Sequence, residues 1–388
     1  MRIIVKNTTA CNLRCVYCSE GERAPSYLDE SLFRKMVDEL PELLDSLNDK
    51  NINILWHGGE PTLWGENRLA SAMSYAEEHL SDYNLDFSMQ SNGYHIGDKL
   101  MEVMRRHRVR VGISLDGYQE IHDQNRPAAD GSHTFDAILK NIDRLREDDL
   151  FGGILIVVNT ATPLDTDRLF DLIRRTGGSA RINPLLSCGR ASGTDTSDIS
   201  ENYLNLLEDL CEKIMNSEEN VLIDPIDGLL DAILTDGTVG ECSFSGFCAK
   251  HIISLYADGL VGFCGRDSAT LSYAYGNLRN QSLASLYFSD TAELMRQRDS
   301  YLKEHDCKDC KIWNFCHGGC SYASLTAFGE LNRKSIECEN RKKLVNYMQT
   351  TGLKLLKERI IRKKRESREK LRKKMEMLKI LESFNERQ

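Results

Sequence analysis

Three cysteines lie close together near the start of the chain, in the stretch ACNLRCVYC, residues 10–18. Cys11, Cys15 and Cys18 have the spacing C-x3-C-x2-C, which places three thiols on one short segment. A closed structural zinc site needs four protein ligands, and four thiolates saturate an ordinary iron–sulfur cluster. Three thiols therefore predict a metal site that keeps one position open, where a substrate can bind.

The remaining cysteines indicate further metal sites. The chain of 388 residues has 13 cysteines, lacks the apolar stretch of a signal peptide, and has no apolar run of membrane-spanning length. We therefore expect a cytosolic protein, in which clustered cysteines are more often metal ligands than disulfide partners. Cys188 and Cys211 stand alone and are interpreted as small buried hydrophobic residues. The others follow in two groups: Cys242, Cys248, Cys264; then Cys307, Cys310, Cys316, Cys320, Cys338.

The first 216 residues alternate between short β-rich runs and amphipathic helical stretches. This alternation predicts βαβ units and a parallel sheet, and six such units favour an α/β partial (β/α)6 TIM-like barrel over a doubly wound sheet. The predicted strands are 2–6, 52–57, 85–90, 110–115, 153–159 and 179–184. The predicted helices lie near 29–47, 66–80, 97–107, 134–148, 166–176 and 199–216.

Polar motifs follow the predicted strands. The cysteine stretch follows the first strand, HGGEP the second, SNG the third, SLDG the fourth and NPLLSCGRA the sixth. In barrels of parallel strands, the chemistry lies at the C-terminal ends of the strands. We therefore expect all of these motifs to gather on one rim.

The composition changes along the chain, and we predict three domains: a barrel at 1–235, a cysteine-rich domain at 236–345 and a basic C-terminal helix at 346–388. The middle segment has little helical periodicity, and a cysteine-rich piece of this size has a thin core, so we expect metal to stabilise it. Residues 350–388 hold 14 Lys and Arg against 6 Asp and Glu, a net charge of +8. Because the whole chain carries −9, the remainder carries −17. The basic helix is interpreted as solvated.

The order of these motifs resembles the radical S-adenosylmethionine (SAM) enzymes that carry a SPASM extension, over roughly residues 1–345. The resemblance rests on the first three cysteines followed by GGEP, on GLVGFC ending at Cys264, and on CKDCKIWNFCHGGC, which is C-x2-C-x5-C-x3-C. It implies that Cys11, Cys15 and Cys18 hold a [4Fe–4S] cluster whose open iron binds SAM. It also implies that SAM is cleaved to a 5′-deoxyadenosyl radical, which abstracts hydrogen from a substrate. A zinc site is the alternative.

The same resemblance implies further site residues. Gly58 and Gly59 would allow close backbone approach, and Glu60 would meet the ammonium group of SAM. Ser114 and Asp116 resemble ribose-contacting positions, Arg126 a residue near the SAM carboxylate, and Tyr17 the aromatic residue that flanks the adenine. A structural role is the alternative for each of the last four.

Eight cysteines would saturate two auxiliary [4Fe–4S] clusters, three clusters in all, with two structural zinc ions as the alternative. By resemblance, one set is Cys242, Cys248, Cys264 and Cys320. The other set is Cys307, Cys310, Cys316 and Cys338.

SPASM enzymes mostly modify peptides and proteins, so the partners expected are a peptide or protein substrate and a reductant such as flavodoxin or ferredoxin. No nucleic-acid or membrane partner is expected. CGRA, residues 188–191, resembles enzymes that install side-chain crosslinks in ribosomally synthesised peptides, and this is the preferred function. Only ten residues precede Cys11, so no N-terminal leader-recognition domain is expected, and the basic tail is one candidate for that role.

Two alternatives remain. Other stretches resemble anaerobic sulfatase-maturating enzymes, which oxidise Cys or Ser to formylglycine. Those enzymes carry an aspartate, taken as the base, directly after the cysteine that matches Cys264. This chain has Gly265 there, and Asp267 is the nearest acid and the candidate catalytic base. A non-catalytic iron–sulfur electron carrier is the alternative from another class.

Overall fold

A computed structural model of the protein describes residues 1–160, 162–266, 271 and 273–385. Within these ranges, ten strands form one sheet in the order β10-β9-β8-β1-β2-β3-β4-β5-β6-β7. From β8 to β7 all neighbours are parallel. The strands of the barrel are β1 (Arg2–Thr8), β2 (Asn51–Gly58), β3 (Asn84–Ser91), β4 (Arg110–Ser114), β5 (Phe151–Val158), β6 (Ser179–Pro184) and β7 (Leu222–Asp224).

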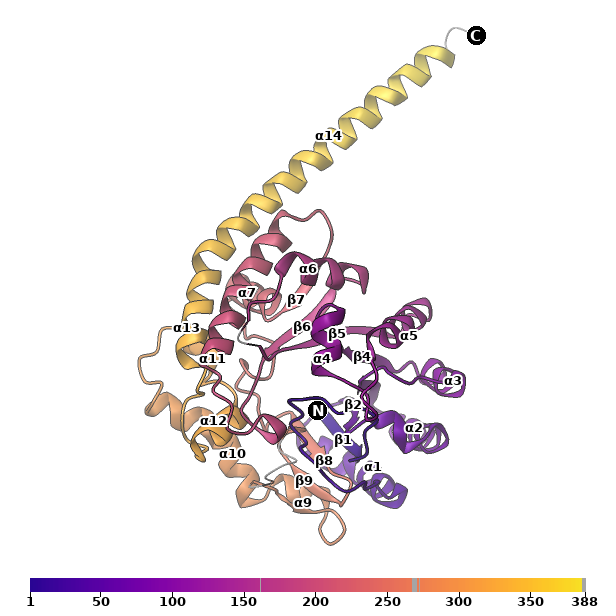
Figure 1. Ribbon diagram of the computed structural model, residues 1–388, viewed down its shortest axis with the longest axis vertical. Helices are drawn as coiled ribbons and strands as arrows, with labels where there is room; N and C mark the ends of the chain where they lie inside the picture. Colours follow the sequence, from indigo (N-terminus) through magenta and orange to yellow (C-terminus); the bar gives the residue numbers. More distant parts are fainter. Residues whose placement is uncertain (161, 267–270, 272, 386–388) are drawn as a thin grey trace.

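The helices lie between the strands in sequence and cover the outer face of the sheet (Figure 1). Because consecutive strands are neighbours and the order never reverses, the sheet is a partial barrel rather than a doubly wound sheet. The predicted fold class is therefore confirmed, and the six predicted strands and six predicted helices are present. The helices are α1 (Glu30–Ser46), α2 (Glu66–His79), α3 (Asp98–Arg106), α4 (Gln119–Asn125), α5 (Phe135–Glu147), α6 (Thr166–Arg175), α7 (Ser197–Asn216) and α8 (Ile226–Thr235).

The core between sheet and helices follows from the sequence pattern. Helix α1 begins after Asp29, whose carboxylate accepts a hydrogen bond from the backbone N–H of Ser31 at 2.9 Å. Its apolar residues recur at helical spacing, and Phe33 stacks on Trp56 of β2 with 5.2 Å between ring centroids. Alternate residues of β2 point the other way, so the next residue, His57, faces the inside of the barrel.

The cysteine-rich segment extends the same sheet. Its strand β8 (Ile252–Leu255) pairs in parallel with β1, and β9 (Leu260–Gly262) and β10 (Gly276–Asn277) continue the sheet in antiparallel fashion. The sequence analysis did not predict these strands. The predicted barrel and the predicted cysteine-rich domain therefore share one sheet. The segment also holds α9 (Leu283–Tyr287), α10 (Asp290–Glu304), α11 (Trp313–Cys316), α12 (Ser321–Phe328) and α13 (Cys338–Tyr347).

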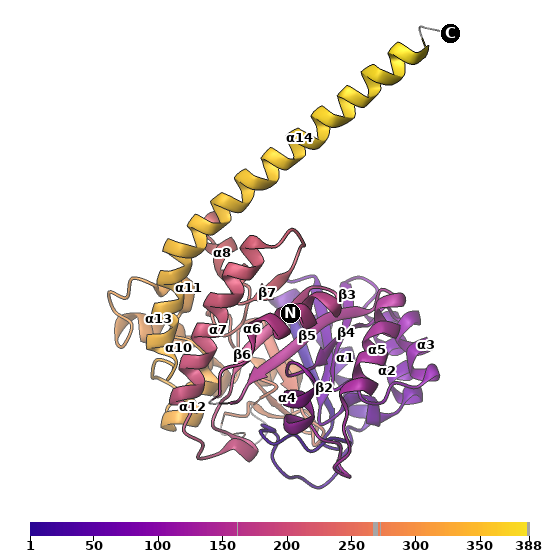
Figure 2. The same ribbon diagram turned by 45° about the horizontal axis from the view of Figure 1, so that its top comes forward.

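Helix α13 continues through a π-helical turn, Met348–Gly352, into the long helix α14 (Leu353–Asn385). The first turns of α14 lie against the end of α7, where Arg359 donates to the carbonyl of Glu219 at 2.8 Å and Arg362 to that of Met215 at 2.6 Å. Beyond them α14 extends away from the body (Figures 1 and 2). None of the helices described is long and apolar enough to cross a membrane.

Candidate functional site

Cys11, Cys15 and Cys18 lie on the loop after β1, at the rim where the parallel strands end. All three line a cavity with a volume of about 310 Å³. Residues at the ends of β2 to β6 also line it, so the motifs predicted to gather on one rim do come together. A cavity of this size is in the range of small-molecule sites.

The two glycines of HGGEP allow the cysteine loop to approach β2 closely. A Cβ atom on Gly59 would lie 2.3 Å from the carbonyl oxygen of Ala10, and one on Gly58 would lie 2.3 Å from that of Thr8. Gly58 also has φ = +136°, which side chains rarely allow. The backbone N–H of Gly59 donates to Thr8 at 2.8 Å. Both glycines line the cavity, and their immediate structural role is to seat the loop that carries the thiols.

Glu60 lies below this cavity rather than on its wall. Its side chain accepts hydrogen bonds from the backbone N–H of Asn92 at 2.7 Å, the hydroxyl of Ser91 at 2.8 Å and the N–H of Thr62 at 3.2 Å. Burial raises the pKa of this carboxyl group. Asn92 in turn points its side-chain amide at Cys11 Sγ, 3.8 Å away. Glu60 therefore orients a polar neighbour of the thiol, and its predicted contact with SAM stays a prediction.

Behind Cys15, three predicted site residues form one buried cluster. Arg126 makes a bidentate ion pair with Asp116 at 2.9 and 3.1 Å, and the hydroxyl of Tyr17 also donates to that carboxylate. The backbone N–H of Val157 donates to Asp116 as well, at 3.1 Å. Tyr17 and Arg126 line the cavity, whereas Asp116 is fully buried behind them. Asp116 thus holds the cation and the phenol in place.

Two N–H donors, one of them in this cluster, point at cysteine sulfur atoms. Arg126 Nη1 is 3.9 Å from Cys15 Sγ, and the backbone N–H of Leu13 is 3.4 Å from Cys11 Sγ. Hydrogen bonds of this kind stabilise thiolates that ligate iron. Ser114 also lines the cavity and accepts a hydrogen bond from Gln90 at 3.0 Å.

A buried ion pair that was not predicted from the sequence reaches the wall of the cavity through Glu20. Lys6 is 3% exposed, forms an ion pair with Glu20, and donates to the carbonyl of Gly265 at 2.7 Å. Among the described residues that line the cavity, Glu20 is the only carboxylate. His57 lies beside this pair, and burial together with the charge of Lys6 lowers its pKa to about 4. In the sequence, the position of Glu20 two residues after Cys18 could have indicated a carboxylate at this site.

The far wall of the cavity comes from distant segments: Gly265 and Arg266 follow Cys264, and Tyr322 lies on α12. Cys188 lines the cavity too and is buried, as expected for a lone cysteine. Asp267, the candidate base, lies outside the described residues, so its role stays a prediction. The cavity is thus enclosed jointly by the three-cysteine loop and the cysteine-rich segment.

The other eight cysteines fall into two spatial sets. Burial raises the pKa of Cys264 to about 12, and the next contributions come from Cys248 and Cys320. Cys242 has the same shift, with Cys320 and Cys264 among its causes. We call Cys242, Cys248, Cys264 and Cys320 the inner set, because Arg266 beside Cys264 also lines the cavity.

The second set comprises the other four cysteines of the segment. Burial raises the pKa of Cys307 to about 11, and Cys316, Cys310 and Cys338 each raise it further. We call these four the outer set. Each set combines residues far apart in the chain, and the assignment of the two sets to two clusters stays a prediction.

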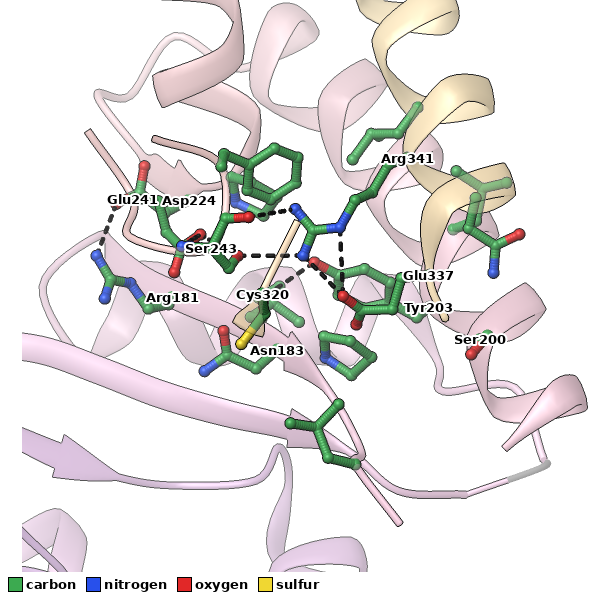
Figure 3. Close-up of a pocket in the computed structure, with 18 of the residues that line it drawn as sticks. Arg181, Asn183, Ser200, Tyr203, Asp224, Glu241, Ser243, Cys320, Glu337 and Arg341 are labelled. Atoms are coloured by element: carbon green, nitrogen blue, oxygen red, sulfur yellow. Dashed lines mark hydrogen bonds and ion pairs between the residues drawn. The ribbon is translucent and has the colours of Figure 1, made fainter. Parts of the chain in front are cut away.

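A small pocket adjoins the cavity beside the inner set (Figure 3). Arg341 points into it, makes an ion pair with Glu337 at 2.7 Å and donates to the carbonyl of Ser243 at 2.8 Å. Cys320 and Asn183 lie on its opposite side, and Asn183 and Arg266 line both spaces. Two ion pairs therefore line this pocket, Arg341 with Glu337 and Arg181 with Asp224 at 3.6 Å.

The described residues include no group of three His, Cys, Asp or Glu side chains that could hold a single metal ion. An iron–sulfur cluster makes a different demand, because each thiolate binds a different iron atom. One set of three cysteines with sulfur-directed donors and two sets of four cysteines fit one open cluster site and two closed ones.

Comparisons with known proteins agree with this arrangement. A model of the Radical SAM superfamily matches residues 5–173, and the SPASM model, an iron–sulfur cluster-binding domain, matches residues 232–311. A cysteine-type anaerobic sulfatase-maturating enzyme of Clostridium novyi is 27% identical over 356 residues, 88% of this chain and 92% of that protein. A serine-type enzyme of Klebsiella aerogenes is 26% identical over 330 residues, 82% of this chain and 79% of that protein.

Two solved structures share the fold. The structure of native anSMEcpe with bound AdoMet superposes with a TM-score of 0.78 at 20% identity, covering 92% of this chain and 99% of that one. Streptococcus suis SuiB bound to precursor peptide SuiA gives a TM-score of 0.65 at 13% identity, covering 87% and 75%.

Proposed function

The chain is a radical SAM/SPASM enzyme, and from this premise we propose that it uses SAM to oxidise a peptide side chain by two electrons. The observation that carries the proposal is the cavity shared by the three-cysteine loop and the segment after Cys264. Cys11, Cys15 and Cys18 would hold the cluster that, with SAM bound, supplies a 5′-deoxyadenosyl radical. A substrate in this cavity would lie between that loop and the inner cysteine set.

The chain's own residues would bind and orient SAM. Arg126 offers a cation at the wall for the SAM carboxylate, and its ion pair with Asp116 fixes the guanidinium. Gln90 and Ser114, hydrogen-bonded to each other, offer polar groups at the ends of β3 and β4. Tyr17 offers an aromatic face, 5.3 Å from the Arg126 guanidinium.

The electron and proton balance of the reaction requires further groups in the rest of the chain. One electron enters from a flavodoxin- or ferredoxin-type reductant, and the substrate gives one hydrogen atom to the adenosyl group. The substrate must then lose one more electron and one proton as its new bond forms. We propose that the eight remaining cysteines hold two auxiliary [4Fe–4S] clusters as sites for that electron. Glu20, which lines the cavity, and Asp267 are the two candidate proton acceptors.

We propose that the substrate is a ribosomally synthesised peptide and that the product is a side-chain crosslink. The position that follows Cys264 supports this choice. A Cβ atom on Gly265 would lie 3.0 Å from Ile4 Cγ2, and Lys6 holds the Gly265 carbonyl. This position therefore has little room for the acidic side chain that sulfatase-maturating enzymes carry there.

Formylglycine formation is the second candidate. It is favoured by the 27% identity with the Clostridium novyi enzyme over most of both chains. That likeness extends through the cysteine-rich segment and not only through the barrel.

The test is an anaerobic assay with two kinds of peptide, one encoded beside this gene and one taken from a sulfatase with Cys or Ser at the modified position. Mass spectrometry would measure the modified peptide and 5′-deoxyadenosine together. A crosslink removes two hydrogens and keeps all sulfur, whereas formylglycine formation converts the side chain to an aldehyde. Conversion of the sulfatase peptide alone would replace the crosslink by the second candidate, and conversion of neither peptide would contradict both.

A further inference from the structure

Arg298 on α10 is buried, with 4% of its surface exposed, and it lies inside the cysteine-rich segment. Every hydrogen bond that it donates to a described residue goes to a neutral acceptor. These acceptors are the carbonyls of Gly318 (3.3 Å), Gly319 (3.0 Å), Leu331 (2.8 Å) and Arg333 (2.8 Å) and the hydroxyl of Ser324 (3.0 Å). A guanidinium cannot lose its proton in a protein, so a positive charge stays at this place.

No carboxylate of the described residues balances that charge. Among the residues that the structure describes, Arg298 takes part in no ion pair, and the adjacent Asp299 interacts instead with His317 at 3.2 Å and Lys250 at 3.8 Å. Burying a charge away from water without an opposite charge beside it is unfavourable. Arg298 lies near two cysteines of each set, Cys248 and Cys320 of the inner set and Cys307 and Cys316 of the outer set. These cysteines would be thiolates once they ligate iron.

The hydrogen bonds of Arg298 also hold the loop that joins the sets. Cys316 belongs to the outer set and Cys320 to the inner set, and Gly318 and Gly319 lie between them with φ of +75° and +76°. A Cβ atom on Gly318 would lie 2.4 Å from Leu302, and one on Gly319 would lie 2.5 Å from the Ser335 Cβ. The loop is therefore tightly seated, and the guanidinium binds the carbonyls of both glycines.

Arg341 provides the natural comparison. It too connects the sets, because Ser243 follows Cys242 of the inner set and Glu337 precedes Cys338 of the outer set. Its guanidinium, however, pairs with the Glu337 carboxylate and stacks on Phe244 at 4.0 Å. Its charge is balanced by a carboxylate, whereas that of Arg298 has no carboxylate partner in the part of the chain that the structure describes.

We propose that Arg298 is a positioning residue that serves as the shared counter-cation of the two auxiliary clusters. It lies between the two cysteine sets, fixes the loop that joins them, and favours the more negative, reduced form of each cluster. Positive charge near an iron–sulfur cluster raises its reduction potential. This inference rests on the proposed assignment of the eight cysteines to two clusters.

The test uses the C11A/C15A/C18A variant as its background, so that only the auxiliary clusters contribute to the measured iron content and redox signal. Arg298→Met removes the charge, and Arg298→Lys keeps it. The double variant Arg341→Met/Glu337→Gln removes a neutralised pair and serves as the matched control. Iron content and an electron-paramagnetic-resonance redox titration would be measured for each variant after anaerobic reconstitution.

We expect Arg298→Met to retain iron and to shift both potentials to more negative values, Arg298→Lys to shift them less, and the control to shift them least. If Arg298→Met loses iron while Arg298→Lys retains it, the charge is required for the clusters to form, which also supports the proposal. Unchanged potentials in iron-loaded Arg298→Met would overturn it, as would equal loss of iron in both variants. A background protein without any [4Fe–4S] iron would instead overturn the auxiliary-cluster assignment itself, and this inference with it.

Discussion

The barrel and the cysteine-rich segment differ in how they pair buried cations, although Arg341 of the segment is paired with Glu337 as the cations of the barrel are paired. Around Cys11, Cys15 and Cys18 each buried cation has a carboxylate partner, Arg126 with Asp116 and Lys6 with Glu20. In the cysteine-rich segment, Arg298 is buried without such a partner among the described residues. The buried cations of the first site are therefore balanced by carboxylates, whereas under the proposed cluster assignment the charge of Arg298 would be balanced when thiolates ligate metal.

The cysteines of the two regions also differ in how they are distributed along the chain. The three-cysteine loop is contiguous and is seated on the barrel by the backbone of Gly59, whereas the inner set spans residues 242–320 and the outer set residues 307–338. A contiguous loop on a packed sheet keeps its shape without metal. Interleaved sets depend on metal to hold distant parts of the chain together.

The largest expected effect comes from the three-cysteine loop. Replacing Cys11, Cys15 and Cys18 with Ala should abolish SAM cleavage, because no other described cysteines lie on that loop, and should leave the fold and the auxiliary iron in place. The measurement is 5′-deoxyadenosine formed under dithionite, with circular dichroism as the check on folding. Residual deoxyadenosine production at the wild-type rate would mean that SAM is cleaved elsewhere.

Breaking a balanced pair tests the barrel side of the comparison. Asp116→Asn leaves Arg126 buried without its charge partner and should lower the free energy of unfolding by about 3–5 kcal/mol. Asp98→Asn breaks the Arg144–Asp98 pair, whose carboxylate is fully exposed, and serves as the control, with little change expected. Denaturant unfolding of the two variants measures the difference. Equal effects would show that the Asp116 pair is no more important than a surface pair.

Removal of iron tests the cysteine-rich segment. Iron-free protein should exchange backbone amide hydrogens in α10 and α12 at least about tenfold faster than reconstituted protein, which corresponds to about 1.4 kcal/mol of lost local stability. Strands β2 to β5 should exchange at the same rate in both forms. Hydrogen-exchange mass spectrometry resolves the two regions in one experiment. Uniform acceleration across the chain would remove the distinction between them.

The smallest effect is expected from the basic helix. Truncation after Lys364 keeps the contacts of Arg359 and Arg362 with the body. The rate of SAM cleavage and the equilibrium constant for unfolding should therefore each change by less than about twofold. The control is Arg362→Ala in the full-length chain, which loses one of those contacts. If the truncated enzyme cleaves SAM normally but no longer modifies its peptide, the tail takes part in substrate recognition rather than being only a solvated helix.

The fold of the barrel could be predicted because its signals are local. Each predicted strand is a short apolar run followed by an amphipathic helix, and β1 to β6 and their helices lie where that pattern predicts. Strands β8 to β10 could not be found in this way. They have only four, three and two residues, and β8 is defined by its pairing with β1, about 250 residues earlier in the chain.

The residues of the site could be predicted where their spacing in the sequence is characteristic. They could not be predicted where their role depends on burial in the folded protein. The three cysteines and HGGEP are recognisable from their order, and they line one cavity, apart from Glu60 and Pro61. The membership of the two other cysteine sets in clusters stays a prediction. The Lys6–Glu20 pair and the unpaired Arg298 were missed, because a lysine at the end of a strand and an arginine in a polar helix both read as surface residues. Their burial depends on tertiary contacts from distant segments.

The central claim is that one open and two closed iron–sulfur sites lie in this chain, and counting iron and sulfide tests it most directly. Anaerobically reconstituted wild-type protein should hold about twelve irons and about twelve sulfides, and the C11A/C15A/C18A variant about eight of each. Mössbauer spectroscopy should assign all of this iron to [4Fe–4S] clusters. About four irons in the wild-type protein, or zinc bound in their place, would contradict the account.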